Sequence, residues 1–261
     1  MRTSWLSQTG CPGDAVLWLW PGQAIYAGPA LDLETHSGSV ACLAVGLDGL
    51  FTVQGQERPE HTTRSALIAS RLPHKLVAHG GRMLFCYLDP SSPRRTGCEQ
   101  RMTAGDPRLR LGHRHERELI RCAPHLDVAA SAQDWLDLAA PTGPARVDHR
   151  IHDATRRLRA EVHRTASAEE LAAECGLSTS RFLHLFSAHT GTSFRRYRLW
   201  TRMLRAAQLI ADRRDLTTAA TDAGFASPSH FSAAFRRMFG LQPSQLLAGG
   251  VTIVDASRGH P

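Results

Sequence analysis

The residues of this sequence whose types and spacing could hold a metal ion lie in its first third. Glu34 and His36 alternate with Asp32 along a predicted β-strand, so the three side chains would share one face of a sheet. His74 follows a proline, where a second strand could face them. Carboxylates and imidazoles ligate divalent metals, but a metal site usually contains more histidine than this. We therefore expect a pocket lined with polar groups, used for a small ligand or for nothing, and no bound metal. A metal site at Glu34, His36 and His74 is the alternative.

A second set of candidate side chains belongs to a pattern that occurs twice near the C-terminus. Two serines are followed by two phenylalanines four residues apart, first from Ser178 to Phe186 and again from Ser227 to Phe235. A serine hydroxyl can cap the first turn of a helix, and phenylalanines at this spacing form one buried stripe. Each run therefore predicts a capped helix with one exposed face. The exposed faces would carry Thr179, Ser180, Leu183, His184 and Ser187 in the first helix, and Ser229, Ser232, Ala233, Arg236 and Arg237 in the second.

A shorter predicted helix precedes each of these runs. Ser167 opens the first short helix with a capping box, and Thr217 is a candidate cap for the second. Each short helix ends at a glycine, Gly176 or Gly224, which suits the left-handed conformation that terminates helices. A helix, a tight glycine turn and a capped helix together predict a helix-turn-helix unit, present here twice.

The two predicted units are joined by residues 192–212, which contain neither proline nor glycine. A helix of about 20 residues is about 30 Å long. This length is close to one turn of B-DNA, about 34 Å, so the second helix of each unit could enter successive segments of the major groove. The spacing therefore favours a DNA-binding protein.

The positive charge of the chain is confined to this helical segment. The formal net charge is +7. Residues 1–143 contain 14 basic and 14 acidic residues, whereas residues 144–246 contain 16 arginines and 9 acidic residues. This confinement favours a phosphate-binding face. The helix predicted from residue 147 to 163 would carry Arg156, Arg157 and Arg159 on its outer face, either as phosphate contacts or as a solvated surface.

The motifs of this segment are the capping sequence after Ser167, Gly176-Leu-Ser, Gly191-Thr-Ser-Phe, Gly224-Phe-Ala-Ser-Pro-Ser-His-Phe and Phe239-Gly-Leu-Gln-Pro-Ser. In them the segment resembles the DNA-binding domain of the AraC/XylS family of transcription regulators. The resemblance implies that double-stranded DNA is the partner and that the second helix of each unit contacts bases. The base contacts it implies fall on Ser180, Leu183, His184, Ser229, Ser232 and Ala233. We assign phosphate contacts to Thr179, Ser187, Arg236 and Arg237.

The base-contact set of the second unit contains no long donor side chain, unlike family members with glutamine or arginine there. We therefore expect the first unit to read most of the sequence and the second to contribute mainly phosphate contacts. In the first unit, Leu183 would meet an apolar group such as a thymine methyl, and His184 would hydrogen-bond a base edge or a phosphate.

The N-terminal part predicts a small all-β domain. Short apolar or alternating runs, separated by turn signals such as Asp48-Gly49, cover residues 15–20, 24–27, 31–36, 40–47, 50–53, 66–69, 75–78 and 83–88. Runs at this spacing indicate a barrel or jelly roll. The part resembles the cupin-like N-terminal domain of the same family, in Trp20-Pro-Gly and Pro73-His74 among other motifs. In the cupin metal pattern a second histidine would stand at Gly38, so the metal set is incomplete.

The predicted fold class has two domains, an all-β cupin-like barrel with a helical linker and an all-α double helix-turn-helix. The expected boundaries are a sensor barrel over 1–90, a linker with a helical hairpin and possible dimer contact over 91–145, a DNA-binding domain over 146–247 and a flexible tail over 248–261. Residues 90–112 read as a loop.

We interpret the chain as a transcription regulator without enzymatic activity, controlled by a small-molecule effector in the N-terminal domain. The expected partners are DNA, that effector, a second copy of the chain and, if the protein is an activator, RNA polymerase. No apolar run approaches the length of about 20 residues that spans a bilayer, so we expect a cytoplasmic protein with unpaired cysteines and no membrane contact. The alternative is a cupin-type metal-dependent enzyme, or a metal or redox sensor, fused to a DNA-binding module.

Overall fold

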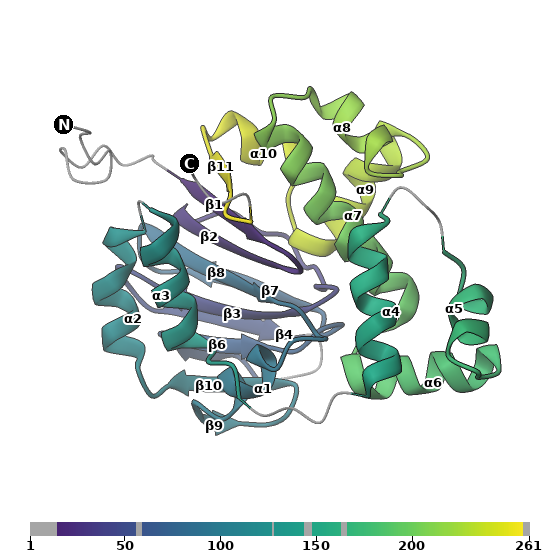
Figure 1. Ribbon diagram of the computed structural model, residues 1–261. Helices are drawn as coiled ribbons and strands as arrows, with labels where there is room; N and C mark the ends of the chain where they lie inside the picture. The colour runs from purple at the N-terminus through teal and green to yellow at the C-terminus, as the bar shows by residue number, and fades with distance from the viewer. Residues whose placement is uncertain (1–14, 56–58, 127, 144–147, 163–165, 258–261) are drawn as a thin grey trace.

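The computed structural model describes residues 15–55, 59–126, 128–143, 148–162 and 166–257. Its β-rich half and its helical half lie side by side (Figure 1). The larger sheet has the strand order β11-β1-β2-β8-β3-β6-β10-β9, and the smaller sheet has the order β5-β4-β7. The strands are β1 (Val16–Trp20), β2 (Gln23–Pro29), β3 (Ala41–Gly46), β4 (Phe51–Gly55), β5 (His61–Thr63), β6 (Ser65–Ile68), β7 (His74–Ala78), β8 (Arg82–Leu88), β9 (Met102–Gly105), β10 (Leu109–His113) and β11 (Thr252–Asp255).

The larger sheet buries both of its faces. One face packs on the smaller sheet, where Phe51 and Leu76 meet Phe85 in a single core. The other face is covered by helices α2 (Glu116–Cys122) and α3 (Ala129–Ala139), and Trp135 of α3 is fully buried there. The Trp135 indole donates a hydrogen bond of 2.9 Å to the Leu119 carbonyl. The apolar residues of these helices therefore complete the core of the β-rich half.

Seven of the eight predicted runs contain a strand, and two predictions for the β-rich half are wrong. Residues 31–36 form no strand, and only a single bridge joins His36 to His74. Residues 90–112 are not a loop, because they contain α1 (Arg94–Glu99), β9 and most of β10. β10 pairs with β6 and buries Leu109 in the core, so pairing and burial outweigh the polar composition of this segment.

Two buried histidines predict a dependence of stability on pH. Burial lowers the pKa of both His74 and His113 from 6.5 to about 4. The unfolded chain therefore binds more protons between these values, so their contribution to stability is complete above pH 6.5 and is lost as the pH falls through 4. We expect each histidine to cost on the order of 2 kcal/mol of unfolding free energy between about pH 7.5 and about pH 5. Urea unfolding at several pH values measures this loss, and His113→Gln should remove about half of it. An unchanged pH profile in that variant would contradict the assignment.

The helical half consists of α4 (His149–Ala160), α5 (Ala168–Glu174), α6 (Thr179–Thr190), α7 (Phe194–Ala211), α8 (Leu216–Asp222), α9 (Pro228–Phe239) and α10 (Pro243–Ala248). The predicted caps of α6 and α9 are confirmed, since Ser178 and Ser227 accept hydrogen bonds from backbone amides of the first turns. Gly176 and Gly224 have φ values of +63° and +82°, as predicted for the glycines that end the short helices. The Thr217 cap is wrong, because Asp215 caps α8 and accepts from the amides of residues 217 and 218. Among the described helices, none is long and apolar enough to cross a bilayer.

The chain returns to the β-rich half after α10. β11 pairs in parallel with β1 at the edge of the larger sheet, with Val16 opposite Thr252 and Leu19 opposite Asp255. The prediction of a flexible tail is therefore wrong for residues 252–255. The signal was weak because the paired segment contains only four residues and follows Gly249-Gly250.

Candidate DNA-binding surface and effector pocket

Two helix-turn-helix units lie at opposite ends of α7 (Figure 1). The first consists of α5 and α6, and the second of α8 and α9. Phe182 and Phe186 of α6 pack with Phe194 and Tyr197 of α7 in the core of the first unit. α7 contains 18 residues, which gives a length of about 27 Å. The linking helix is therefore present, a few residues shorter than predicted.

The candidate base-contact residues of α6 are accessible. Ser180 and His184 are exposed, while the phosphate candidates Thr179 and Ser187 are half-buried. Leu183 is 37% exposed, which is unusual for a large apolar residue in the described part of this chain. The structure therefore places an exposed leucine beside an exposed histidine on α6, and their contact with bases stays a prediction.

In the second unit, only part of the outer face of α9 is free of contact with the β-rich half. Ser229 and Ala233 are exposed and Ser232 is half-buried, so the N-terminal end of the helix is accessible. At the other end, the Arg236 guanidinium forms two hydrogen bonds of 2.8 Å with the carboxylate of Glu34. Arg237 is exposed. Two of the three guanidinium nitrogens of Arg236, Nε and Nη2, are therefore engaged by Glu34.

Glu34, His36 and His74 do not form a shared ligand set. Glu34 is occupied by Arg236, and the rings of His36 and His74 lie with centroids 4.4 Å apart. His36 Nδ1 lies 2.9 Å from the Glu34 carbonyl oxygen. Within the described ranges, no three histidine, cysteine, aspartate or glutamate residues are grouped to hold a metal. The segment that was expected to line a polar pocket instead contacts the helical half.

That contact involves the backbone of residues 34–38. The Glu34 amide donates to the Gly240 carbonyl at 2.8 Å, and the Ser37 amide donates to the Arg237 carbonyl at 3.1 Å. Gly240 ends α9 with φ +79°, and a Cβ atom there would lie 2.6 Å from the Glu34 carbonyl oxygen. The C-terminal end of α9 is therefore fitted closely to the β-rich half.

A buried ion pair fastens α4 to the same half. Arg159 Nη1 lies 2.7 Å from the Asp89 carboxylate, 2.8 Å from the Ser91 hydroxyl and 2.8 Å from the Tyr197 hydroxyl. Burial raises the pKa of Asp89, and the Arg159 charge opposes that shift. The prediction that Arg159 lies on an outer face is wrong, because this side chain turns toward the end of β8. The periodicity of one helix could not reveal a partner 70 residues earlier in the chain.

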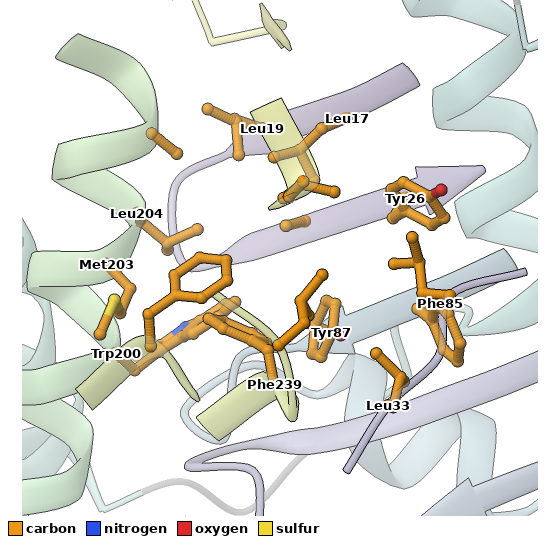
Figure 2. Close-up of a pocket in the computed structure, with 16 residues that line it drawn as sticks. Leu17, Leu19, Tyr26, Leu33, Phe85, Tyr87, Trp200, Met203, Leu204 and Phe239 are labelled. Carbon is orange, nitrogen blue, oxygen red and sulfur yellow. The ribbon is translucent and has the colours of Figure 1, made fainter. Parts of the chain in front are cut away.

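An apolar cavity of about 80 Å³ lies between the two halves. Figure 2 shows its sixteen lining residues. The β-rich half contributes Leu17, Leu19, Ala24, Tyr26, Leu31, Leu33, Phe85 and Tyr87, and the helical half contributes Trp200, Met203, Leu204, Ala207, Phe235, Phe239, Leu241 and Leu246. Because each half supplies eight of them, the size of the cavity depends on how the halves are positioned. The sequence did not predict this cavity, since the two sets of residues are far apart in the chain.

Three of the described cysteines lie in the interior of the β-rich half. Cys42 and Cys86 are buried, and Cys98 is fully buried in the core. Burial raises the pKa of the Cys98 thiol well above its ordinary value. A buried thiol with a raised pKa contains little of the reactive thiolate form.

Comparison with known proteins agrees with this geometry. Residues 171–249 match the family model described as a helix-turn-helix domain. The probable transcriptional regulator LumQ of Photobacterium leiognathi is 40% identical over 80 residues, which are 30% of this chain and 32% of LumQ. The regulator RipA of Corynebacterium glutamicum is 36% identical over 95 residues, which are 36% of this chain and 28% of RipA. The matches thus span about a third of the length of these curated relatives. The C-terminal part of the chain is a helix-turn-helix domain of the AraC type, which confirms the resemblance in the sequence.

The fold of both halves is found in ToxT from Vibrio cholerae. An apo crystal structure of ToxT aligns with a TM-score of 0.62 and 11% identity, over 87% of this chain and 97% of ToxT. A structure of ToxT with a bound unsaturated fatty acid aligns with a TM-score of 0.53 and 13% identity, over 86% of this chain and 94% of ToxT. This likeness shows a shared two-domain fold, with a β-rich domain followed by a helix-turn-helix domain.

Proposed function

We propose that this protein is a sequence-specific DNA-binding transcription regulator whose activity is controlled by a small molecule. The observation that carries the proposal is the pair of capped helix-turn-helix units at the two ends of α7, in the arginine-rich part of the chain. The probable transcriptional regulator LumQ and the transcriptional regulator RipA, which match in this region, support it. Binding of the purified full chain to promoter fragments from its own genome, with the salt dependence measured, tests the proposal. No binding above that of random DNA at low ionic strength would refute it.

In this proposal α6 reads most of the sequence through Ser180, Leu183 and His184. His184→Ala should cost about 1–3 kcal/mol on the specific site and relax the preference at one base pair. Arg237→Ala should weaken specific and random DNA alike and reduce the salt slope by about one. Fluorescence anisotropy with a specific site, its single-base variants and random DNA measures both effects. Equal losses on specific and random DNA for His184→Ala would contradict its assignment to a base.

The cavity between the halves is the proposed effector site, in place of a polar site at Glu34, His36 and His74. A crystal structure of ToxT, which shares the fold, contains an unsaturated fatty acid, and this supports a small-molecule effector. The apolar lining of the cavity, which comes equally from both halves, supports the cavity as its site. A ligand at this place would alter the contact between residues 34–38 and α9 more directly than a ligand inside the β-rich half. Effector binding would thereby change how α9 is presented to DNA.

The proposal also includes a homodimer, and contact with RNA polymerase if the protein activates transcription. The described surfaces of α2 and α3 that face the sheet are occupied by the core, so a dimer would use their outer faces. Sedimentation of the full chain with and without promoter DNA measures the oligomeric state. The same proposal places the protein in the cytoplasm and assigns it no enzymatic activity.

A further inference from the structure

The chemistry of the cavity between the halves restricts the kind of molecule that it can hold. No arginine, lysine or histidine is among the sixteen lining residues, although the chain contains 31 basic residues. Transfer of an anion into such surroundings is unfavourable unless a cation or several hydrogen-bond donors meet it. The lining therefore selects against a ligand with a buried carboxylate, sulfonate or phosphate.

The polar atoms of the lining are almost all in use. The Tyr26 hydroxyl donates to the Pro29 carbonyl at 2.9 Å, and the Trp200 indole N–H donates to the Gly22 carbonyl at 2.9 Å. Tyr87 differs, because within the described part of the chain its hydroxyl has no hydrogen-bond partner. Its ring packs against Trp200 and Phe239, with centroid distances of 5.8 Å and 5.4 Å. The Tyr87 hydroxyl, in a lining of aromatic and aliphatic groups, thus remains for a ligand.

We propose that the effector is an uncharged, mostly apolar molecule with a ring system and one oxygen that hydrogen-bonds the Tyr87 hydroxyl. Its rings stack among Tyr87, Trp200 and Phe239, where offset and edge-on arrangements are favourable. This inference rests on the proposed function of the cavity as an effector site. It departs from a fatty-acid effector, since the lining offers no cation for a buried carboxylate.

The size of the cavity adds a second requirement. A cavity of about 150 Å³ accommodates benzene, and the cavity here, about 80 Å³, is smaller. Drug-sized ligands occupy pockets of about 300 Å³ or more. A ring system therefore fits only when the walls move apart, and the opposing walls belong to different halves. Binding of such a ligand therefore requires the helical half to move relative to the β-rich half.

A matched pair of fluorescent probes tests the charge requirement on the full chain. N-phenyl-1-naphthylamine and 1-anilinonaphthalene-8-sulfonate share one ring framework, and only the second carries a sulfonate. We expect the uncharged probe to bind at least about tenfold more tightly, a difference of about 1.4 kcal/mol. Ala207→Leu narrows the cavity from α7 without disturbing a helix, and it should weaken the uncharged probe. Equal or tighter binding of the sulfonate, or no effect of Ala207→Leu, would overturn the proposal.

A third probe tests the role of Tyr87. The ketone 6-propionyl-2-dimethylaminonaphthalene is uncharged and can accept a hydrogen bond, whereas N-phenyl-1-naphthylamine has no oxygen. Tyr87→Phe keeps the ring, so it should weaken the ketone about fivefold, the size of one hydrogen bond, and leave the other probe unchanged. Equal effects on both probes would overturn the assignment of the hydroxyl. DNA binding is measured separately: a chain that binds DNA but no uncharged probe refutes this inference alone, whereas a chain that binds the probe but no DNA refutes the proposed function.

Discussion

Replacement of Arg159 by alanine is expected to lower the free energy of unfolding by about 3–5 kcal/mol. The reason is the environment of Asp89, whose carboxylate is almost fully buried and has Arg159 as its cationic partner. Removal of the guanidinium leaves that carboxylate without its counter-charge and the hydroxyls of Ser91 and Tyr197 without a donor. Urea unfolding of the full chain at about pH 7 measures the loss.

The control is Arg156→Ala on the same helix. Arg156 also pairs with an aspartate, Asp153, but the side chains are 71% and 58% exposed, so its loss should stay within about 1 kcal/mol. The double variant Asp89→Asn, Arg159→Met removes both charges together and should recover part of the stability. An Arg159→Ala variant no less stable than Arg156→Ala would show that the buried pair does not hold α4 to the β-rich half.

Gly240→Ala is expected to open the contact between α9 and residues 34–38. The left-handed backbone at Gly240 costs a residue with a Cβ about 1–2 kcal/mol. In addition the new methyl group would lie 2.6 Å from the Glu34 carbonyl oxygen and 2.8 Å from His36 Nδ1. The amides of Glu34 and Ser37, which donate to the end of α9, should therefore exchange hydrogen with solvent faster. Hydrogen exchange by NMR measures these two amides directly.

Gly176→Ala is the control that distinguishes the cost of a left-handed backbone from the cost of the steric clash at Gly240. Gly176 has a similar φ of +63°, but nothing lies within 4 Å of a Cβ placed there. This variant should lose about 1–2 kcal/mol and leave the exchange of the Glu34 and Ser37 amides unchanged. Gly240→Ala should lose at least twice as much. Similar losses and similar exchange in the two variants would contradict a close fit between Gly240 and the 34–38 segment.

The two helix-turn-helix units could be predicted from the sequence because their signals are local. Serine caps, terminal glycines and phenylalanines four residues apart each act within one or two turns, and Ser178, Ser227, Gly176 and Gly224 occupy the predicted positions. The exposed face of α6 follows from the same spacing. Its assignment to DNA bases stays a prediction, because that depends on a partner absent from the local pattern.

The contact between the halves could not be predicted in the same way. Arg159 meets Asp89, Arg236 meets Glu34 and β11 meets β1 across large separations in sequence. In each case the local sequence pattern is equally compatible with an exposed residue or a free tail. Whether the residue or segment is paired depends on how the two halves pack together. The cavity has the same origin, since Tyr87 and Trp200 are unremarkable apolar positions until the halves meet.

The pairing of β11 with β1 limits the way in which the two halves can move. β1 is the first described strand and β11 the last, so their hydrogen bonds close the polypeptide into a ring that runs through both halves. The two halves are thus linked at two places, by the chain before α4 and by the β1–β11 pairing. The helical half cannot move away from the β-rich half as a hinge about the first link while the second stays intact. Leu17 and Leu19 of β1 also border the cavity, so a ligand there would contact one of the two strands that join the halves. A small rotation of the helical half about the β1–β11 pairing would displace the distant α5–α6 end of α7 the most.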